Sequence, residues 1–450
     1  MSDKKSIHGM WASRWVFIMA ATGSAVGLGN IWKFPYITGI NGGGAFVLVY
    51  LICVALIGLP ILMAEIMTGR RGRQSPVNSL IEVAGESGGA RYWQLIGWMG
   101  ALAGLLIFGF YSVVAGWVLE YGIEMARGTF NGADMKQVGD IFAALLASPG
   151  KMLIWHTIFT ILTMFVLIKG VNAGLERSIQ ILMPALFILL FVAFGYGISS
   201  GHFSDAWHFM FDFEPGKLTA TAVLSALGHA FFTLSLGMGT MIAYGSYMTQ
   251  KASIGSTAVL VVFLDTAVAL VAGLSIFPIV FANHMDPGQG PGLMLVTLPV
   301  AFGNMALGQL FGTLFFVLVA IAAWTSSISL MEPSVAFVIE KFKLSRAQAC
   351  ALLGAMGWLL GVGALLSFNT ASDIKLFGKN FFDFLDYITA NIMLPLGGLF
   401  IAIFAGWVVK TRLSREELSI SPLAHQLWLI LVRFVAPLLV LIVFIYNLYQ

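Results

Sequence analysis

An apolar stretch near the start of the chain contains residues that favour a break in a helix. Positions 20 to 30 read Ala-Ala-Thr-Gly-Ser-Ala-Val-Gly-Leu-Gly-Asn. Each glycine weakens a helix by about 1 kcal/mol relative to alanine, so the cluster predicts unwinding between Ser24 and Asn30. Unwound carbonyl oxygens can bind cations, and free amides at a helix N-terminus can bind a carboxylate. Close packing of small residues is the alternative, but it would need neither Asn30 nor Lys33.

Two later apolar stretches carry comparable chemistry. Residues 231 to 239 read Phe-Phe-Thr-Leu-Ser-Leu-Gly-Met-Gly, and residues 322 to 327 read Ala-Ala-Trp-Thr-Ser-Ser. Hydroxyl groups inside a membrane helix often bond a carbonyl of their own preceding turn, yet beside unwound carbonyls they are hard oxygen ligands suited to Na+. Asp265 lies in an apolar run, Val-Val-Phe-Leu-Asp-Thr-Ala. A carboxylate at the centre of a membrane helix costs about 3 kcal/mol, so it requires a cation or a proton.

The composition indicates which kind of protein positions these residues. Of 450 residues, 59% are hydrophobic and 10% are charged, and the mean hydropathy is +0.90. Soluble domains carry about 25% charged residues, so a soluble fold is excluded. A span needs about 20 mostly apolar residues. We therefore predict an all-α polytopic membrane protein, a single domain over residues 1–450, with eleven transmembrane helices near residues 14–38, 45–69, 92–124, 152–168, 178–198, 221–248, 255–282, 309–339, 347–367, 384–409 and 426–447.

The basic residues of the short loops predict the orientation. With the N-terminus inside, sixteen fall on the cytoplasmic side: Lys4, Lys5, Arg14, Arg70, Arg71, Arg73, Arg91, Lys169, Arg177, Lys251, Lys341, Lys343, Arg346, Lys410, Arg412 and Arg415. Six fall outside: Arg127, Lys136, Lys151, Lys217, Lys375 and Lys379. We expect a cytoplasmic N-terminus, an outer C-terminus and the lipid bilayer as a partner. The net charge of +3 follows from this topology and is no evidence for binding nucleic acid.

The sequence lacks the residue patterns that several other functions would require. Cys53 and Cys350 both fall inside predicted spans, so neither a disulfide framework nor a thiol metal site is available. The seven histidines show no HExxH spacing, and no GxxxxGK phosphate loop occurs. An intramembrane enzyme would need a nucleophile beside a base, and His156 and His229 have no obvious partner. We expect no enzyme, and transport would be driven by an ion gradient.

The two glycine-rich breaks fall in the first and sixth predicted spans. This spacing predicts a 5+5 inverted repeat over about residues 10–200 and 220–411, with helices 1 and 6 unwound and an extra helix at about 426–447. Corresponding interrupted helices in two repeats indicate the central binding site of a transporter.

These motifs resemble the neurotransmitter:sodium symporter family, particularly its bacterial amino-acid branch. The matching stretches are residues 23–35 (GSAVGLGNIWKFP), 41–46 (NGGGAF), 231–239 and 325–328 (TSSI), within a resemblance that covers residues 10 to about 447. The resemblance implies a LeuT-like fold in a bacterial inner membrane. It also implies a sodium-coupled symporter that imports neutral hydrophobic L-amino acids by alternating access, with two co-transported Na+ ions.

Position by position, the resemblance implies two sodium sites built from oxygen atoms, as a hard cation requires. The first would comprise the substrate carboxylate, the Ala25 carbonyl, Asn30, Thr233 and Asp265. The second would comprise the carbonyls of Gly23, Val26 and Ala322 and the hydroxyls of Thr325 and Ser326. Because the substrate carboxylate completes the coordination of the first ion, sodium and amino acid would bind cooperatively.

The resemblance also implies a substrate site. The amides of Leu28 and Gly29 and the Tyr111 hydroxyl would bind the carboxylate, and the carbonyls of Ala25, Phe232 and Thr233 would bind the ammonium. The side-chain pocket would be lined by Ile107, Phe232, Ser235, Met238, Ser326 and Leu330. Gly27 stands where monoamine transporters of the family have an aspartate, so the substrate must bring its own carboxylate.

Three further residues bear on specificity and coupling. Met238 replaces a phenylalanine of the leucine transporter, and its flexible thioether favours a broad range of aliphatic and aromatic amino acids, simple packing being the alternative. Asp265 stands where the family usually has Asn, so it would supply the negative charge that chloride supplies elsewhere, and chloride would not be required. Glu65 matches a buried acid near the first break, with either a structural role on unwound backbone or a role in proton exchange.

Gates complete the expected pathway. The outer gate would be Lys33 and Asp386 above a lid of Tyr111 and Phe232, and the pair would be loose or water-mediated because lysine lacks the planar fork of arginine. The inner gate would be Trp11, Tyr247 and Glu340, with His8 in place of the expected arginine. In the fifth span, Gly174 and Pro184 resemble a family motif for local unwinding, although an ordinary proline kink is the alternative.

Two rival functions stay open. A non-transporting amino-acid sensor could use the same binding site, although no cytoplasmic domain is seen that would transmit a signal. A channel is disfavoured because the gates come in pairs and no polar stripe runs along one helix.

Overall fold

The chain folds as a bundle of helices in this computed structural model, which describes residues 6–288, 290 and 292–449. Within those ranges there is no β-strand, and a single isolated bridge joins Leu376 and Lys379. Lys4 and Lys5, which contribute to the predicted orientation, lie outside the described residues.

The first half of the chain forms ten α-helices. They are α1 (Arg14–Ala25), α2 (Phe34–Ile40), α3 (Gly44–Cys53), α4 (Leu59–Gly72), α5 (Pro76–Ser87), α6 (Gln94–Arg127), α7 (Met135–Leu146), α8 (Pro149–Ile168), α9 (Arg177–Ser199) and α10 (Phe203–Phe211). Shorter π-helical or 3-10 turns connect or extend them: η1 (Gly29–Lys33), η2 (Val54–Gly58), η3 (Arg91–Trp93), η4 (Val171–Glu176) and η5 (Pro215–Lys217).

The second half forms the remaining helices. They are α11 (Ala220–Thr233), α12 (Thr240–Ser246), α13 (Ile254–Ala282), α14 (Leu298–Asn304), α15 (Gly308–Phe342), α16 (Arg346–Leu366), α17 (Phe381–Tyr387), α18 (Leu394–Ile403), α19 (Thr411–Leu418), α20 (Pro422–Ile430) and α21 (Ala436–Tyr449). The π-helical turns here are η6 (Leu293–Thr297), η7 (Ile388–Met393), η8 (Phe404–Val408) and η9 (Leu431–Val435).

Nine helical stretches of the described residues are long and apolar enough to cross a membrane, and they coincide with nine of the predicted spans. A tenth is the bent pair formed by α1 and the helix Gly29–Ile40, which meet at 51°. The remaining predicted span, residues 221–248, corresponds to α11 and α12, each too short to cross alone. The count of eleven stays a prediction that requires these two helices to form one interrupted span.

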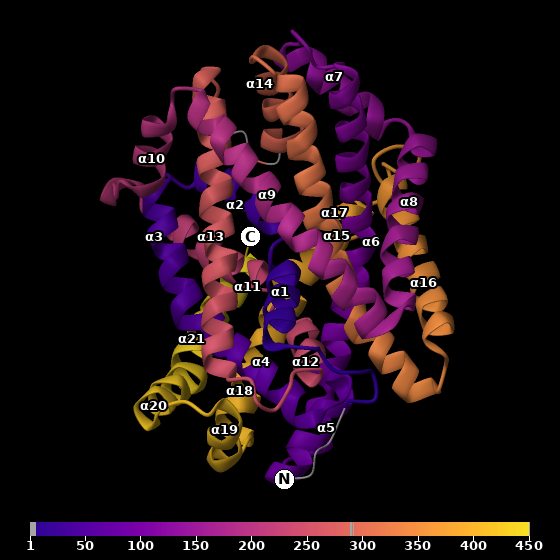
Figure 1. Cartoon of the computed structure of the whole chain (residues 1–450), viewed down its shortest axis with the longest axis vertical. Coiled ribbons are helices and arrows are strands. Elements are labelled where there is room, and N and C mark those ends of the chain that lie inside the picture. The colour runs from indigo at the N-terminus through magenta and orange to yellow at the C-terminus, as the bar shows by residue number, and fades with distance from the viewer. Residues whose placement is uncertain (1–5, 289, 291, 450) are drawn as a thin grey trace.

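Different helices form the two opposite ends of the bundle (Figure 1). α5 and α19 lie at one end of the bundle and α7 and α14 lie at the opposite end, while α1 runs through the middle. α1 packs against α9, α13 and α15, and the two longest helices, α6 and α15, pack along each other. A Cβ atom at Gly104 of α6 would lie 2.5 Å from the Leu330 carbonyl oxygen of α15, so glycine permits this close approach.

The fifth span shows a local irregularity near the predicted motif. Gly174 lies in the π-helical turn η4, and Pro184 lies inside α9. Proline cannot donate a backbone hydrogen bond, so this part of the span is weaker than a regular helix. Local unwinding at this point remains a prediction.

Candidate functional site

The first helix break is narrower than the predicted segment Ser24 to Asn30. α1 continues through Ala25, Val26 is extended with ψ 102°, and helical backbone resumes at Leu28, before η1. Asn30 Oδ1 accepts a hydrogen bond from the Gly27 amide at 3.2 Å, which satisfies one donor freed by the break. Asn30 is therefore part of the structure of the break, as its position suggested.

The second break lies between the end of α11 at Thr233 and the start of α12 at Thr240. Ser235, Gly237 and Gly239 have positive φ angles of 54°, 80° and 75°. Glycine adopts this conformation readily, whereas serine does so at a cost. Ser235 Oγ donates a hydrogen bond to the Ser24 carbonyl at 2.9 Å, so its backbone conformation connects the two breaks.

Three of the residues predicted for the first sodium site form one buried cluster. Asn30 Nδ2 donates to Asp265 Oδ1 at 2.8 Å and to the Asp265 backbone carbonyl at 3.0 Å. Thr233 Oγ1 donates to the two Asp265 carboxylate oxygens at 3.2 and 3.1 Å. Asp265 and Asn30 are fully buried, and no Lys, Arg or His of the described residues forms an ion pair with Asp265. A buried carboxylate with uncharged donors alone fits a small cation.

The hydroxyl groups of α15 divide between two roles. Thr325 Oγ1 bonds its own helix, at 3.2 Å to the Ile321 carbonyl and 3.1 Å to the Ala322 carbonyl. Ser326 Oγ instead reaches α1 and the first break, at 3.3 Å from the carbonyls of both Ser24 and Val26. A Cβ atom at Gly23 would lie 3.6 Å from Thr325 Cβ, so the predicted members of the second sodium site lie together.

A small cavity of about 30 Å³ lies between the two breaks, α6 and α15. It is lined by Ser24, Ala25, Gly27, Leu28, Gly29, Ile107, Tyr111, Phe232, Ser235, Met238, Ser326 and Leu330. All the predicted substrate-binding residues line this central cavity except Thr233, whose hydroxyl faces Asp265. Ser24 and Gly27 are additional lining residues, and both belong to the glycine-rich motif.

Gly27 keeps part of this space open. A Cβ atom at this position would lie 2.4 Å from Ser326 Oγ and 3.3 Å from the Tyr111 hydroxyl oxygen. The Leu28 amide donates to the same Tyr111 oxygen at 3.5 Å. An unwound amide and a phenol hydroxyl therefore face a space that any side chain at position 27 would fill.

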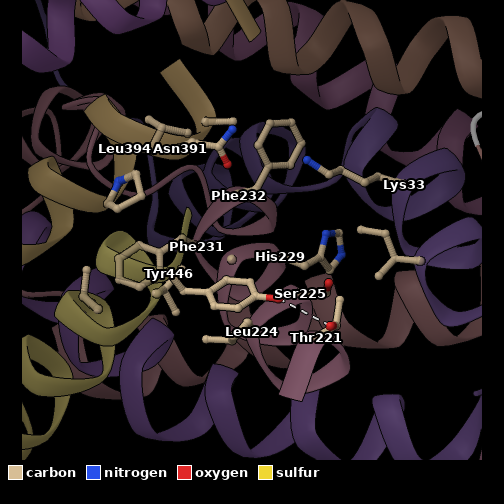
Figure 2. A pocket seen from close by; sticks show the side chains of 16 residues that line it. Lys33, Thr221, Leu224, Ser225, His229, Phe231, Phe232, Asn391, Leu394 and Tyr446 are labelled. Atoms are coloured by element: carbon tan, nitrogen blue, oxygen red, sulfur yellow. Dashed lines mark hydrogen bonds between the residues drawn. The ribbon is translucent and has the colours of Figure 1, made fainter. Parts of the chain in front are cut away.

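An outer cavity of about 100 Å³ adjoins the central one and is lined by Lys33, Asp386, Tyr111 and Phe232, among others. Phe232 and Tyr111 line both cavities and lie at the boundary between them. Lys33 Nζ lies 4.3 Å from the centroid of the Phe232 ring, an arrangement also visible in Figure 2. Among the described residues no ion pair joins Lys33 to Asp386, although both line the same cavity. A loose outer pair was expected for lysine.

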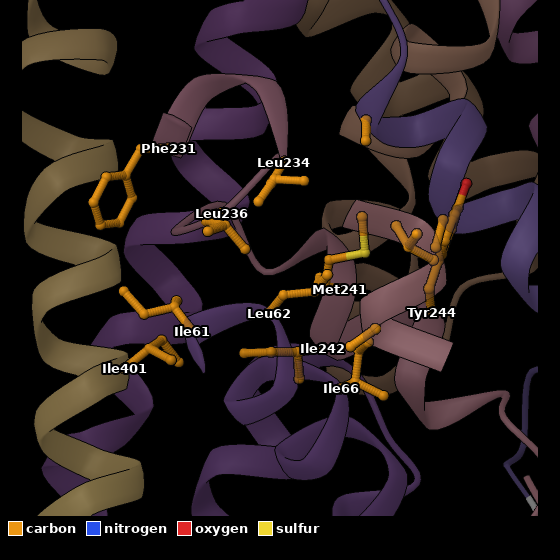
Figure 3. Packing of buried hydrophobic residues seen from close by; sticks show 14 of the residues in the cluster. Ile61, Leu62, Ile66, Phe231, Leu234, Leu236, Met241, Ile242, Tyr244 and Ile401 are labelled. Carbon is orange, nitrogen blue, oxygen red and sulfur yellow. The ribbon is translucent and has the colours of Figure 1, made fainter. Parts of the chain in front are cut away.

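The inner half of the second broken helix, α12, packs directly on α4. A Cβ atom at Gly69 would lie 1.9 Å from the Ile242 carbonyl oxygen, so the two backbones touch. Figure 3 shows Leu234 and Leu236 of the break and Ile242 of α12 packed with Leu62 and Ile66 of α4.

Glu65 of α4 belongs to the same contact between α4 and the second broken helix. Its Oε1 accepts from the Gly237 amide at 2.8 Å, and the side chain is fully buried. Glu65 thus bonds unwound backbone, but its hydrogen bond goes to the second break, whereas the sequence suggested the first.

The predicted inner gate divides into two clusters. The Trp11 amide donates to the Tyr247 carbonyl at 2.9 Å, and the Tyr247 hydroxyl donates to Glu332 Oε1 at 2.7 Å rather than to Glu340. Glu332 in turn pairs with Arg346. Sequence reasoning missed this pair, although an acid inside a predicted span was a visible signal.

Glu340 lies in the second cluster, which adjoins the first through the rings of His8 and Tyr247, 6.1 Å apart. His8 Nε2 lies 2.8 Å from Glu340 Oε1, and both side chains are almost fully buried. The Ser75 amide donates to Glu340 at 2.7 Å and Asn78 Nδ2 donates at 2.6 Å. His8 therefore occupies the position at which an arginine was expected.

Comparison with known proteins decides the family. The model of the sodium:neurotransmitter symporter family matches residues 8–134 and 133–450 of the chain. The chain belongs to this family. It is a family of secondary transporters and not of enzymes, and the membrane-spanning helices make this member an integral membrane protein.

Relatives of this symporter cover nearly its full length. An uncharacterised sodium-dependent transporter of Bacillus subtilis, YhdH, is 36% identical over 99% of this chain and 98% of its own. An uncharacterised sodium-dependent transporter of Haemophilus influenzae is 35% identical over 98% of both chains. The crystal structure of MhsT in complex with L-phenylalanine is 43% identical, superposes with a TM-score of 0.90, and covers 98% of this chain and 99% of that one.

Proposed function

We propose that this symporter imports neutral hydrophobic L-amino acids, aliphatic and aromatic, in a sodium-coupled alternating-access cycle. The observation that carries the proposal is the central cavity between the two helix breaks. Its lining is mostly apolar, and it holds the Leu28 amide, the Tyr111 hydroxyl and the space kept by Gly27. The complex of MhsT with L-phenylalanine, a neutral amino acid with an apolar side chain, supports this substrate class.

Two sodium ions accompany the substrate in this proposal. The first binds to the Ala25 carbonyl, Asn30, Thr233 and Asp265, and the burial of the Asp265 carboxylate without a cationic partner among the described residues supports a cation there. The second binds to the carbonyls of Gly23, Val26 and Ala322 and the hydroxyls of Thr325 and Ser326. Both donor sets consist of oxygen atoms, as Na+ requires.

Coupling follows from shared ligands. The substrate carboxylate lies against the Leu28 and Gly29 amides and completes the coordination of the first ion, so each favours the binding of the other. The ammonium group binds to the carbonyls of Ala25, Phe232 and Thr233. The fixed charge of Asp265 replaces the anion used by chloride-dependent relatives, so chloride is not required.

The gates open in turn about this fixed site. Lys33, Asp386, Tyr111 and Phe232 close the outer side, and Trp11, Tyr247, Glu340 and His8 close the inner side. The two inverted repeats, about residues 10–200 and 220–411, move relative to each other, with the N-terminus in the cytoplasm and the C-terminus outside a bacterial inner membrane. The basic residues of the loops support this orientation.

Uptake into proteoliposomes tests the proposal. An inward sodium gradient should accumulate labelled leucine above its external concentration, and collapsing the gradient with a sodium ionophore should release it. Unlabelled tryptophan should compete with leucine. Failure to accumulate any neutral amino acid would overturn the proposal, and sodium-dependent binding without accumulation would support a sensor instead.

A further inference from the structure

A third cavity lies behind Phe232, between the first and sixth spans and the C-terminal helices (Figure 2). Its volume is about 190 Å³, larger than the central and outer cavities. Lys33, Phe232, His229 and Asn391 line it together with Val440 and Val443 of α21. Phe232 lines all three cavities, so this rear cavity is the free space directly behind the proposed outer lid.

The polar end of the rear cavity contains groups that lack partners. His229 is 2% exposed, yet neither of its ring nitrogens has a hydrogen-bond partner among the described residues. Lys33 Nζ lies over the Phe232 ring and forms no ion pair within the described part of the chain. An ammonium without an ion pair and an imidazole without a hydrogen bond indicate a ligand with a negative charge and hydrogen-bonding atoms, because leaving buried polar groups unsatisfied is costly.

Much of the remaining wall is apolar and limits the size of a ligand, although Thr221, Ser225 and Tyr446 add hydroxyl groups to it. Leu224, Phe231, Leu394, Val440 and Val443 surround the space. An apolar protein cavity of about 150 Å³ holds a benzene molecule, so this one accommodates a single ring with a small polar group. A ligand that combines one ring with one negative charge is an aromatic carboxylate.

A ligand can reach this space from the outer end of the bundle. Thr221, in the first turn of α11, is exposed and lies in the cavity wall, whereas His229 lies two turns deeper and is buried. Under the proposed orientation this end of α11 faces the outside. The outer solution and the outer leaflet are therefore the two possible sources of a carboxylate.

We propose that the rear cavity is a regulatory site for small aromatic carboxylates, which bind between Lys33 and His229 and hold Phe232 in its closed position. The binding site follows from the geometry of the rear cavity alone, whereas its regulatory effect rests on the proposed function. Phe232 must leave its place before the central cavity can open outward. An occupant of the rear cavity takes the space behind the ring, and its carboxylate fixes the ammonium in place over the ring face, so the lid stays closed.

Direct binding of benzoate to the purified full-length protein tests the site without sodium or amino acid. Saturable binding is expected, whereas benzylamine, which carries the same ring with a positive charge, should not bind. Filling the cavity from two different helices, with Val443→Phe or Ser225→Leu, should weaken benzoate binding by about tenfold or more. The control Ile442→Phe changes an exposed neighbour on α21 and should bind as the wild type does.

The outcomes of the binding experiment separate the alternatives. Absence of saturable binding, or unchanged binding in both filling variants, would overturn the site. Displacement of benzoate by saturating leucine in sodium would place benzoate in the central cavity and would also overturn it. If decanoate displaces benzoate, and if decanoate binding is also weakened by Val443→Phe, the outer leaflet is the source of the carboxylate. If decanoate does not displace benzoate, the source is a soluble acid in the outer solution.

The regulatory effect is measured by the dissociation of labelled leucine from the protein in sodium. Benzoate should slow dissociation by about fivefold or more in the wild type and in Ile442→Phe, but not in Val443→Phe. Unchanged dissociation at saturating benzoate would overturn the effect on the lid. Absence of leucine binding together with retained, Val443-dependent benzoate binding would count against the proposed substrate and not against the site.

Discussion

Ser235 Oγ donates a hydrogen bond to the Ser24 carbonyl oxygen, 2.9 Å away, and so connects the second helix break to the first. Ser326 Oγ of α15 donates to the same carbonyl at 3.3 Å. One backbone oxygen of α1 therefore holds both the second break and α15 at the central cavity. The geometry of the cavity depends on this contact as much as on the residues that face the substrate.

Replacing Ser235 with alanine should loosen the contact between the two breaks. A hydrogen bond of this kind is worth about 1 kcal/mol, so leucine affinity should fall roughly fivefold. Equilibrium binding of labelled leucine in sodium measures the change. Ser329→Ala is the matched control, because the buried Ser329 hydroxyl bonds only the Ser326 carbonyl of its own helix. Equal affinities in the two variants would contradict the role of Ser235.

Gly27→Ala should abolish leucine binding while the protein still folds. The new methyl group would lie 2.4 Å from Ser326 Oγ, in the space assigned to the substrate. Gly195→Ala is a suitable control, since a Cβ atom there meets no atom within 4 Å. Binding of labelled leucine and the midpoint of thermal unfolding should be measured together. A Gly27→Ala variant with normal affinity would show that the substrate lies elsewhere.

Much of the fold could be predicted from the sequence because lipid imposes a length and an apolar composition on each span. The boundaries of the long helices agree with the predicted spans to within four residues, except that the fifth span begins at Val171, seven residues before the predicted start. The breaks were visible because glycines clustered with polar residues are unusual inside such spans. The helices outside the spans, such as α7 and α10, were not predicted, because short amphipathic segments carry a weaker signal.

Contacts between distant spans were harder to predict. Glu65 was recognised as a buried acid, but its hydrogen bond to Gly237 depends on how α4 and α12 pack. The Tyr247 hydroxyl was assigned to the inner gate, yet its acceptor is Glu332. Local sequence shows that a polar group needs a partner, whereas the choice among partners is made by the arrangement of helices.

Met238→Phe should narrow the range of substrates. Met238 is buried and lines the central cavity, where a flexible thioether adapts to side chains of different shape and a rigid ring does not. Competition by tryptophan should weaken by roughly tenfold, a loss typical of overpacking by one or two kcal/mol, while leucine uptake stays within about threefold of the wild type. Met356→Phe, at an exposed position of α16, is the control. Undiminished competition by tryptophan would mean that Met238 only packs against its neighbours.

Asp265→Asn should make transport depend on chloride. Uptake by the wild type should be equal in gluconate and chloride buffers, because the carboxylate is fixed beside Asn30 and Thr233. Without that charge, sodium affinity in gluconate should fall roughly tenfold, equivalent to about 1.4 kcal/mol of lost attraction, and chloride should restore part of it. Asp205→Asn, on the exposed surface of α10, controls for the loss of a negative charge. Chloride-dependent uptake by the wild type would contradict the prediction.

His8→Ala should weaken the inner gate only partly. Glu340 would lose its contact with His8 but keep the donors Ser75 and Asn78, so the carboxylate would still be bound. The closed inner state should become less populated, and because sodium-dependent leucine binding requires that state, affinity should fall by about threefold.

His8→Arg should preserve or strengthen the gate, since a guanidinium is always charged and can bind both carboxylate oxygens of Glu340. Leucine affinity in this variant should therefore match or exceed that of the wild type. His202→Ala removes a partly exposed histidine that contacts Asp205 and serves as the control for both substitutions. If alanine and arginine at position 8 gave the same affinity, the contact with Glu340 would not contribute to closure. A difference in the expected order, arginine above alanine, would show that the contact between position 8 and Glu340 helps to close the inner side.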